Sequence, residues 1–86
     1  MPNPNEIDLI VVVNGQPTPL TENLQAPLRT AIEHALHASG NSGQPIDNWE
    51  MRDDGGQILD SARKIGEFAF PPGVRLFLNL KAGVGG

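Results

Sequence analysis

The chain contains no cysteine and no long hydrophobic run, and each absence excludes a class of protein. Disulfides, thiol nucleophiles and thiolate metal ligands all require a cysteine sulfur. The longest apolar run, Leu9 to Val13, is far shorter than the roughly 20 residues of a membrane-spanning helix. A chain without cysteine also suits a reducing compartment. We therefore expect a cytoplasmic protein with no membrane among its partners.

Aromatic residues and clustered positive charge are also scarce. With one tryptophan, three phenylalanines and no tyrosine, the chain offers little on which bases could stack. Ten acidic residues outweigh six basic ones, which gives a net charge of -4. The basic residues are dispersed along the chain: Arg29, Arg52, Arg63, Lys64, Arg75 and Lys81. Without a basic patch to follow phosphates, no nucleic-acid partner is expected.

The first third of the chain predicts a β-hairpin. Residues 7–13 are mostly β-branched and apolar, as in a central strand that is buried on both faces. Asn14-Gly15 predicts a type I′ turn, because both residues tolerate a positive φ. The return strand, residues 16–20, contains Pro17 and Pro19, which cannot donate hydrogen bonds to a neighbouring strand. It must therefore be very short or lie at the edge of a sheet.

One long amphipathic helix is predicted next, beginning at residues 24–26. Thr21 or Asn23 is the predicted N-cap, with Glu22 near the positive end of the helix dipole. Gly40 is the predicted C′ residue. The apolar residues recur at steps of three and four and form one stripe: Leu24, Leu28, Ala31, Ile32, Ala35 and Leu36.

The second half predicts two further strands. Residues 47–52 alternate, with Trp49 and Met51 pointing inward, and residues 74–80 alternate as the final strand. Shorter elements are expected between them. Residues 57–59 form a short strand or an extended segment, a helical turn capped by Asp60 or Ser61 runs to Gly66, and residues 68–70 pack aromatic area under the sheet.

This order of elements predicts an α+β fold with two layers, in which the long helix crosses a mixed sheet of four to five strands. Residues 7–13 and 74–80 are the natural central pair. They must run parallel, because a crossover connects them, while their hairpin partners run antiparallel. This arrangement is the β-grasp architecture.

Several stretches resemble ubiquitin-like protein modifiers. They are Asn14-Gly15 after the first strand, Thr21-Glu22-Asn23 before the helix, Ile58-Leu59-Asp60 after a turn, and the last strand that runs into Gly85-Gly86. Three stretches resemble, more narrowly, small bacterial proteins encoded beside activating-enzyme, conjugating-enzyme and JAB-type peptidase homologues: residues 26–29, 48–53 and 76–86. The two prolines and two asparagines of residues 1–5 predict a disordered lead-in. The resemblance implies a ubiquitin-like domain at 6–81 and a flexible diglycine tail at 82–86.

The resemblance implies chemistry done on this protein rather than by it, so the chain itself is not expected to be an enzyme. An activating enzyme would use ATP to adenylate the Gly86 carboxylate, then pass the acyl group to a cysteine and on to amines of target proteins. Gly85 and Gly86 lack Cβ atoms and suit a narrow channel. The implied partners are the activating enzyme, a conjugating enzyme, a JAB-type deconjugating peptidase and the targets. No cofactor of its own is expected, and a role in antiviral defence is one implied process.

The tail departs from that of ubiquitin, whose arginines are read by its activating enzyme. Here Ala82, Gly83 and Val84 stand in the tail and Lys81 is the nearest cation. These four residues are the candidates for tail recognition, and they predict an activating enzyme other than ubiquitin's.

The surface that ubiquitin uses for recognition is also altered. The outward positions on the middle strand are Glu50 and Arg52, which are polar, and Phe77 is the apolar position on the last strand. Phe77, flanked by Arg75 and Asn79, is the first candidate for a partner contact or for weak homo-oligomer formation. A singly exposed aromatic is also common on protein surfaces.

The lysines and the histidines form two further pairs of candidate site residues. Lys64 and Lys81 are the only lysines, so they are the candidate acceptors if the protein forms chains, although both also fit as ordinary surface residues. His34 and His37 are spaced like metal ligands on a helix, but no third ligand is evident nearby. We predict two solvated histidines and no metal.

Two other functions stay open at this point. A sulfur carrier of the same fold would bear a C-terminal thiocarboxylate instead of entering conjugation. A binding module would use the sheet face or an edge strand and would not need the tail.

Overall fold

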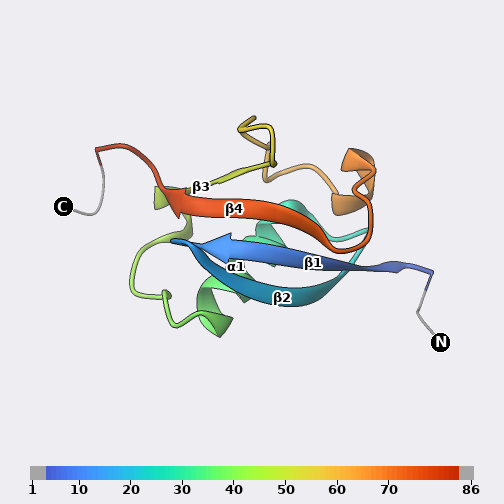
Figure 1. Ribbon diagram of the computed structural model, residues 1–86, viewed down its shortest axis with the longest axis horizontal. Helices are drawn as coiled ribbons and strands as arrows, with labels where there is room; N and C mark the ends of the chain where they lie inside the picture. Colours follow the sequence, from blue (N-terminus) through green and yellow to red (C-terminus); the bar gives the residue numbers. More distant parts are fainter. Residues whose placement is uncertain (1–3, 84–86) are drawn as a thin grey trace.

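The computed structural model describes residues 4–83 and has the ubiquitin-like β-grasp architecture, as predicted. One helix lies across one face of a four-stranded mixed sheet (Figure 1). The elements in chain order are β1 (Glu6–Val13), β2 (Gln16–Asn23), α1 (Leu28–Ala38), the 3₁₀ turn η1 (Ile46–Asn48), β3 (Trp49–Arg52), the 3₁₀ turn η2 (Ile65–Phe68) and β4 (Val74–Leu80). No helix in this part of the chain is long and apolar enough to span a membrane.

The strand order β2-β1-β4-β3 confirms the predicted central pair. β1 pairs in parallel with β4, and β2 and β3 are antiparallel edge strands. Asn14 and Gly15 have φ values of 49° and 85° in the hairpin turn, as expected for type I′. β2 is longer than predicted and stays paired from Gln16 to Asn23. Its prolines are tolerated because the N–H groups of alternate residues in an edge strand point away from the sheet. These positions need no N–H donor, since no strand lies on that side.

The core fills the space between the sheet and α1. β1 and β4 direct alternate residues into it, and Leu76 and Leu78 are fully buried. Trp49 and Met51 point inward from β3 at 5% and 1% exposure, as predicted. The five buried residues of α1 are those of the predicted stripe without Leu24: Leu28, Ala31, Ile32, Ala35 and Leu36.

The helix begins later than predicted. Thr21 and Asn23 belong to β2, and the N-cap of α1 is Pro27, which makes no side-chain capping bond. The backbone N–H groups of the first two helical residues instead donate to the carbonyls of Arg63 and Ser61, at 2.8 and 2.9 Å. A neighbouring stretch of backbone therefore replaces the side-chain cap that the sequence predicted.

The end of the helix agrees with the prediction. Gly40 has a φ of 76° and stands just after the C-cap residue Ser39. The N–H of Gly40 donates to the carbonyl of His37, and the N–H of Asn41 donates to that of Leu36. This is the hydrogen-bond pattern of a Schellman motif.

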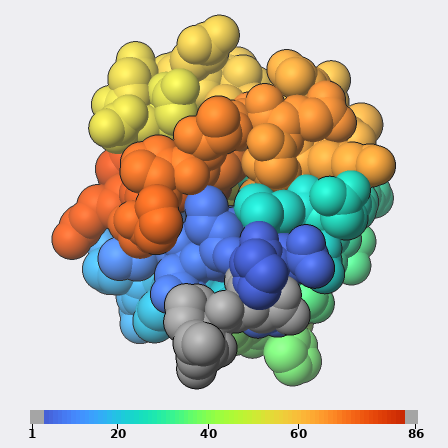
Figure 2. Space-filling model, turned by 90° about the vertical axis from the view of Figure 1, so that its right-hand side faces the viewer, coloured from blue at the N-terminus to red at the C-terminus, as the bar shows by residue number. Residues whose placement is uncertain are grey.

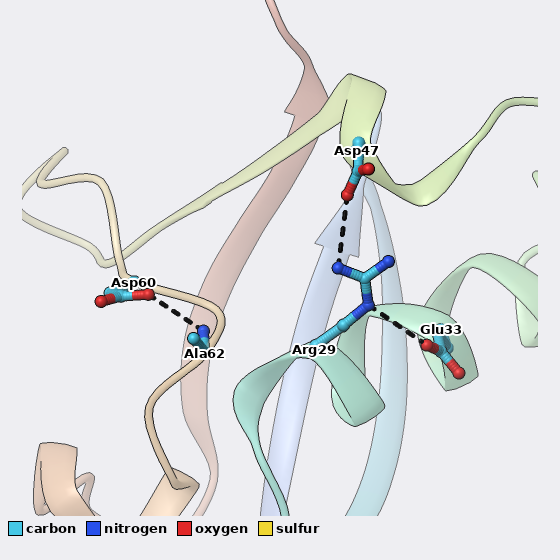
Figure 3. A network of polar contacts seen from close by, with 5 residues as sticks. All are labelled: Arg29, Glu33, Asp47, Asp60 and Ala62. Atoms are coloured by element: carbon cyan, nitrogen blue, oxygen red, sulfur yellow. Dashed lines mark hydrogen bonds and ion pairs between the residues drawn. The ribbon is translucent and has the colours of Figure 1, made fainter.

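The segment before η2 agrees with its prediction in one part and differs in another. Residues 57–59 form the extended segment rather than a fifth strand, since Ile58 makes only an isolated bridge to Arg52. The Asp60 carboxylate accepts a hydrogen bond from the N–H of Ala62 at 3.0 Å (Figure 3), but this forms a turn and not a helix. The backbone at 61–63 is bonded to the start of α1, so helical geometry is delayed until η2.

Arg29 connects α1 to η1 on the surface. Its guanidinium lies 3.3 Å from the Asp47 carboxylate and 3.6 Å from that of Glu33 (Figure 3). The Arg29 side chain is 47% exposed, so these pairs contribute at most about 1 kcal/mol each. They hold the loop before β3 near the helix without determining the fold.

Glu22 occupies a different place from the one predicted. It lies in β2 with its side chain 4% exposed, and its Oε2 atom is 2.7 Å from Nδ1 of His34 on α1. Because an ionised carboxylate only accepts hydrogen bonds, Nδ1 donates. His34 therefore has a hydrogen-bond partner that the sequence did not predict, although its side chain is 58% exposed. His37 is exposed as well, so both rings reach solvent as predicted.

Replacing His34 by alanine should lower the free energy of unfolding by about 1–3 kcal/mol, because the buried Glu22 carboxylate loses its hydrogen-bond donor. Urea denaturation at neutral pH measures the loss. His37→Ala is the matched control on the same helix and should change stability by less than about 0.5 kcal/mol. Adding Glu22→Leu to His34→Ala should restore most of the loss. Equal stability of the two histidine variants would contradict the role of the pair.

Candidate functional site

The end of β4 is where the chain leaves the sheet. The N–H of Lys81 donates to the carbonyl of Asn48 at 2.8 Å. Ala82 and Gly83 follow in an exposed turn, and Gly83 has a φ of 86°. Of the predicted tail residues, Val84, Gly85 and Gly86 lie outside the described part of the chain. In Figure 1 the β4 arrow points to the same end of the molecule as the β1 arrow, where the hairpin connects β1 to β2.

The candidate partner residues on β3 and β4 share the face of the sheet that is turned away from α1, which we call the outer sheet face. Phe77 stands opposite Arg52, and Asn79 stands opposite Glu50. Arg75 lies two residues before Phe77 and is therefore on the same face. The strand register thus brings together all five residues that the sequence predicted for this surface.

Polar contacts hold part of this face in place. The Arg52 guanidinium donates to the carbonyl of Gly56 at 2.9 Å and lies 3.5 Å from the Glu50 carboxylate. Glu50 is only 20% exposed and Phe77 is half-buried. Phe77 therefore lies between an anchored ion pair on β3 and the residues of β1.

Sequence reasoning did not assign the β1 and β2 residues of this face. Val12 stands opposite Phe77 on one side and Pro17 on the other, so three apolar residues form one row across three strands. Val12 is only 7% exposed although it lies outside the core cluster. Ile10 pairs in the same way with Pro19. The sequence shows that residues 7–13 are apolar on both faces of the strand. Only the strand register shows that Pro17 and Pro19 lie beside them.

The two candidate acceptor lysines lie in different surroundings. Lys64 is exposed just before η2, and its Nζ is 3.4 Å from the side-chain oxygen of Gln25. Lys81 is exposed directly after β4. The structure does not bring the two amines together, so each would form a separate attachment point.

The described residues offer no metal centre. In residues 4–83, no three or more histidine, cysteine, aspartate or glutamate side chains are arranged to hold an ion. One nitrogen of His34 is already bonded to Glu22.

Solved structures show the same fold. A protein designed de novo on the basis of ubiquitin superimposes with a TM-score of 0.78 and 16% sequence identity, over 98% of this chain and 99% of the design. Ubiquitin from Caldiarchaeum subterraneum gives a TM-score of 0.73 and 14% identity, over 93% of this chain and 99% of that one. At such low identity these likenesses establish the ubiquitin-like fold and nothing finer.

Sequence relatives are more similar. The uncharacterized protein y4jI of Sinorhizobium fredii (strain NBRC 101917 / NGR234) is 48% identical over 83 residues, which is 96% of this chain. The chain spans 64% of the length of that relative. A family model described as "Protein of Unknown function (DUF2604)" matches residues 2–86. Since that match covers nearly every residue, the chain belongs to the DUF2604 family.

Proposed function

We propose that this protein is a ubiquitin-like modifier that is activated at the carboxylate of Gly86 and attached to amines of target proteins. The observation that supports the proposal most is the position of β4. This strand is held between β1 and β3, and the chain leaves the sheet directly after it, with Lys81, Ala82 and Gly83 exposed. A rigid domain thus carries the glycine-rich segment at its end.

The proposed chemistry begins with a poor electrophile. A carboxylate oxygen of Gly86 attacks the α-phosphorus of ATP, and pyrophosphate leaves. A cysteine thiolate of the activating enzyme then attacks the acyl carbon, and AMP leaves. Transfer to a conjugating enzyme exchanges one thiol for another. A target amine finally displaces that thiol and forms an amide bond.

Gly85 and Gly86 suit this reaction because a residue without Cβ leaves the acyl carbon open to attack in a narrow channel. Lys81, Ala82, Gly83 and Val84 would be read by the enzyme on the way to it. A chain that continued beyond Gly86 would first need hydrolysis of the peptide bond after Gly86, a step suited to a JAB-type peptidase.

The outer sheet face is the proposed docking surface for the activating or conjugating enzyme. Phe77 and Val12 supply an apolar centre, and Arg52, Glu50 and Arg75 supply polar groups around it. A central apolar contact with a polar rim is the usual arrangement of a protein interface.

Deleting Gly86 should abolish adenylate and thioester formation, because the reacting carboxylate moves back by one residue. Gly86→Ala should slow both steps at least about 10-fold by adding a Cβ at the reacting residue. ATP–pyrophosphate exchange with the cognate activating enzyme measures the first step. Gly43→Ala is the matched control, since a Cβ at Gly43 would meet no atom within 4 Å. If deletion of residues 84–86 left the rate of ATP–pyrophosphate exchange unchanged, the carboxylate of Gly86 would not be the reacting group. That result would favour a plain binding module instead.

Intact-mass analysis of the protein after co-expression with its activating enzyme separates a modifier from a sulfur carrier. A modifier should keep the mass of the free acid or appear as conjugates that resist reducing agents. A sulfur carrier should gain about 16 Da, because one carboxylate oxygen is replaced by sulfur in the activated acyl group. A stoichiometric species of that heavier mass would overturn conjugation as the primary function.

Phe77→Ala should reduce the rate of thioester formation by about 10-fold, because it removes the apolar centre of the outer sheet face. Circular dichroism and urea unfolding should show that the variant is still folded. Leu24→Ala is the matched control, since it removes a half-buried apolar side chain between β2 and α1. A rate for Phe77→Ala equal to that of the control would place the docking surface elsewhere.

A further inference from the structure

A second surface lies beside edge strand β3 and has no part in the site described above. It is an open groove of about 460 Å³ between the loop at 53–60 and the segment 68–71, and we call it the Ile58 groove. Figure 2 shows the segments around residues 50–60 (yellow) and 60–75 (orange) side by side along the upper part of the view. The groove therefore has walls from two parts of the chain.

The floor of the Ile58 groove is apolar. Ile58 is 55% exposed and is the only exposed large hydrophobic side chain among residues 4–83. Phe68 and Phe70 stack with their ring centroids 5.0 Å apart and their planes at 5°. Ala69 between them has a φ of 53°, which is unfavourable for a residue with a Cβ. The backbone thus accepts strain where the two half-buried rings are stacked beside the groove.

The rim of the groove is acidic. Asp53, Asp54 and Asp60 line it, and none of them forms an ion pair within the described chain. Asp53 uses Oδ1 to accept N–H groups of its own turn, and Asp60 does the same. Each therefore keeps its other carboxylate oxygen for another donor.

This arrangement differs from most of the acidic surface, although Glu6 and Asp8 on β1 also lie outside the ion pairs. Five other carboxylates of the described chain each lie within an ion pair: Glu22, Glu33, Asp47, Glu50 and Glu67. The one cation that lines the groove, Arg63, is already engaged, since it lies 3.2 Å from Glu67 and 5.2 Å from the centre of the Phe68 ring. The groove thus combines an exposed apolar floor with negative charge that no local cation offsets.

We propose that the Ile58 groove docks an extended segment of a partner protein in which lysine or arginine alternates with aliphatic residues. The aliphatic side chains would cover Ile58 and the stacked rings, and the cations would reach the rim carboxylates. Long basic side chains suit such a place, because their stems pack on apolar surface while their charges stay in water. Nucleic acids and anionic lipids carry the wrong sign of charge.

The groove and the tail are at opposite ends of β4. Val74 lines the groove, and the tail follows Leu80, roughly 20 Å further along an extended strand. A partner in the groove would therefore leave uncovered the end of β4, where the described chain leaves the sheet. The inference does not depend on the proposed conjugation, and either can fail without the other.

The test is a titration of the ¹⁵N-labelled full chain with a capped hexapeptide of alternating leucine and lysine, followed by two-dimensional NMR. Amide shifts should change at 53–60 and 68–71, and affinity should fall with added salt. The hexapeptide with glutamate in place of lysine is the control ligand and should bind at least about 10-fold more weakly.

Variants decide whether the groove is the binding site. Ile58→Ser should weaken binding about 10-fold and Asp54→Asn about 3-fold, because they remove floor and rim separately. Both side chains are exposed, so the fold should persist. Glu6→Gln, an exposed carboxylate on β1, should bind like the natural chain. Shifts confined to the outer sheet face, equal binding of the glutamate peptide, or shifts that depend on protein concentration without peptide would each overturn the proposal, the last in favour of a second copy of this chain.

Discussion

The parallel pairing of β1 with β4 is the constraint on which the rest of this structure depends. Two parallel neighbours cannot be joined by a tight turn, so the chain must cross from one to the other, and everything from β2 to η2 belongs to that crossing. The pairing buries alternate residues of both strands against α1, including Leu76 and Leu78. It also fixes the direction in which β4 points, and with it the place where the glycine-rich segment begins.

A second set of backbone bonds completes the fold at the opposite end. The start of α1 donates two N–H groups to the carbonyls of Ser61 and Arg63, and the N–H groups of Ile65 and Gly66 donate to the carbonyls of Ala26 and Leu24. The approach at Gly66 is close, since a Cβ there would lie 3.1 Å from the Leu24 oxygen. These bonds place η2 next to the beginning of the helix, and they hold the segment that leads into the Ile58 groove. The same backbone hydrogen bonds therefore cap the helix and position the segment that leads into the groove.

The sequence predicted what local patterns determine and missed what long-range contacts determine. Alternation placed Trp49 and Met51 inward and located β4 correctly, because a half-buried strand has a period of two. The helix start was misplaced, because Thr21 and Asn23 are good local caps but the actual cap is backbone from residues 61–63. Likewise, the pairing of Glu22 with His34 depends on how β2 lies against α1, which no spacing along the chain reveals. Phe77 was found as a candidate, whereas its neighbours Val12 and Pro17 required the strand register.

The two surfaces that carry the proposals are kept apart by the geometry of a single strand. Phe77, midway along β4, belongs to the outer sheet face, while Val74 at its beginning lines the Ile58 groove. An enzyme that handled the tail could dock near the end of β4 and leave the groove open for a different protein. The charges of the two surfaces support this division: Arg52 and Glu50 offset each other on the outer face, but the rim carboxylates of the groove are not offset. Under the proposed function, an apolar surface with a paired arginine and glutamate near the end of β4 would suit an enzyme that binds and releases repeatedly. The unpaired carboxylates of the proposed groove site would instead select a partner of opposite charge.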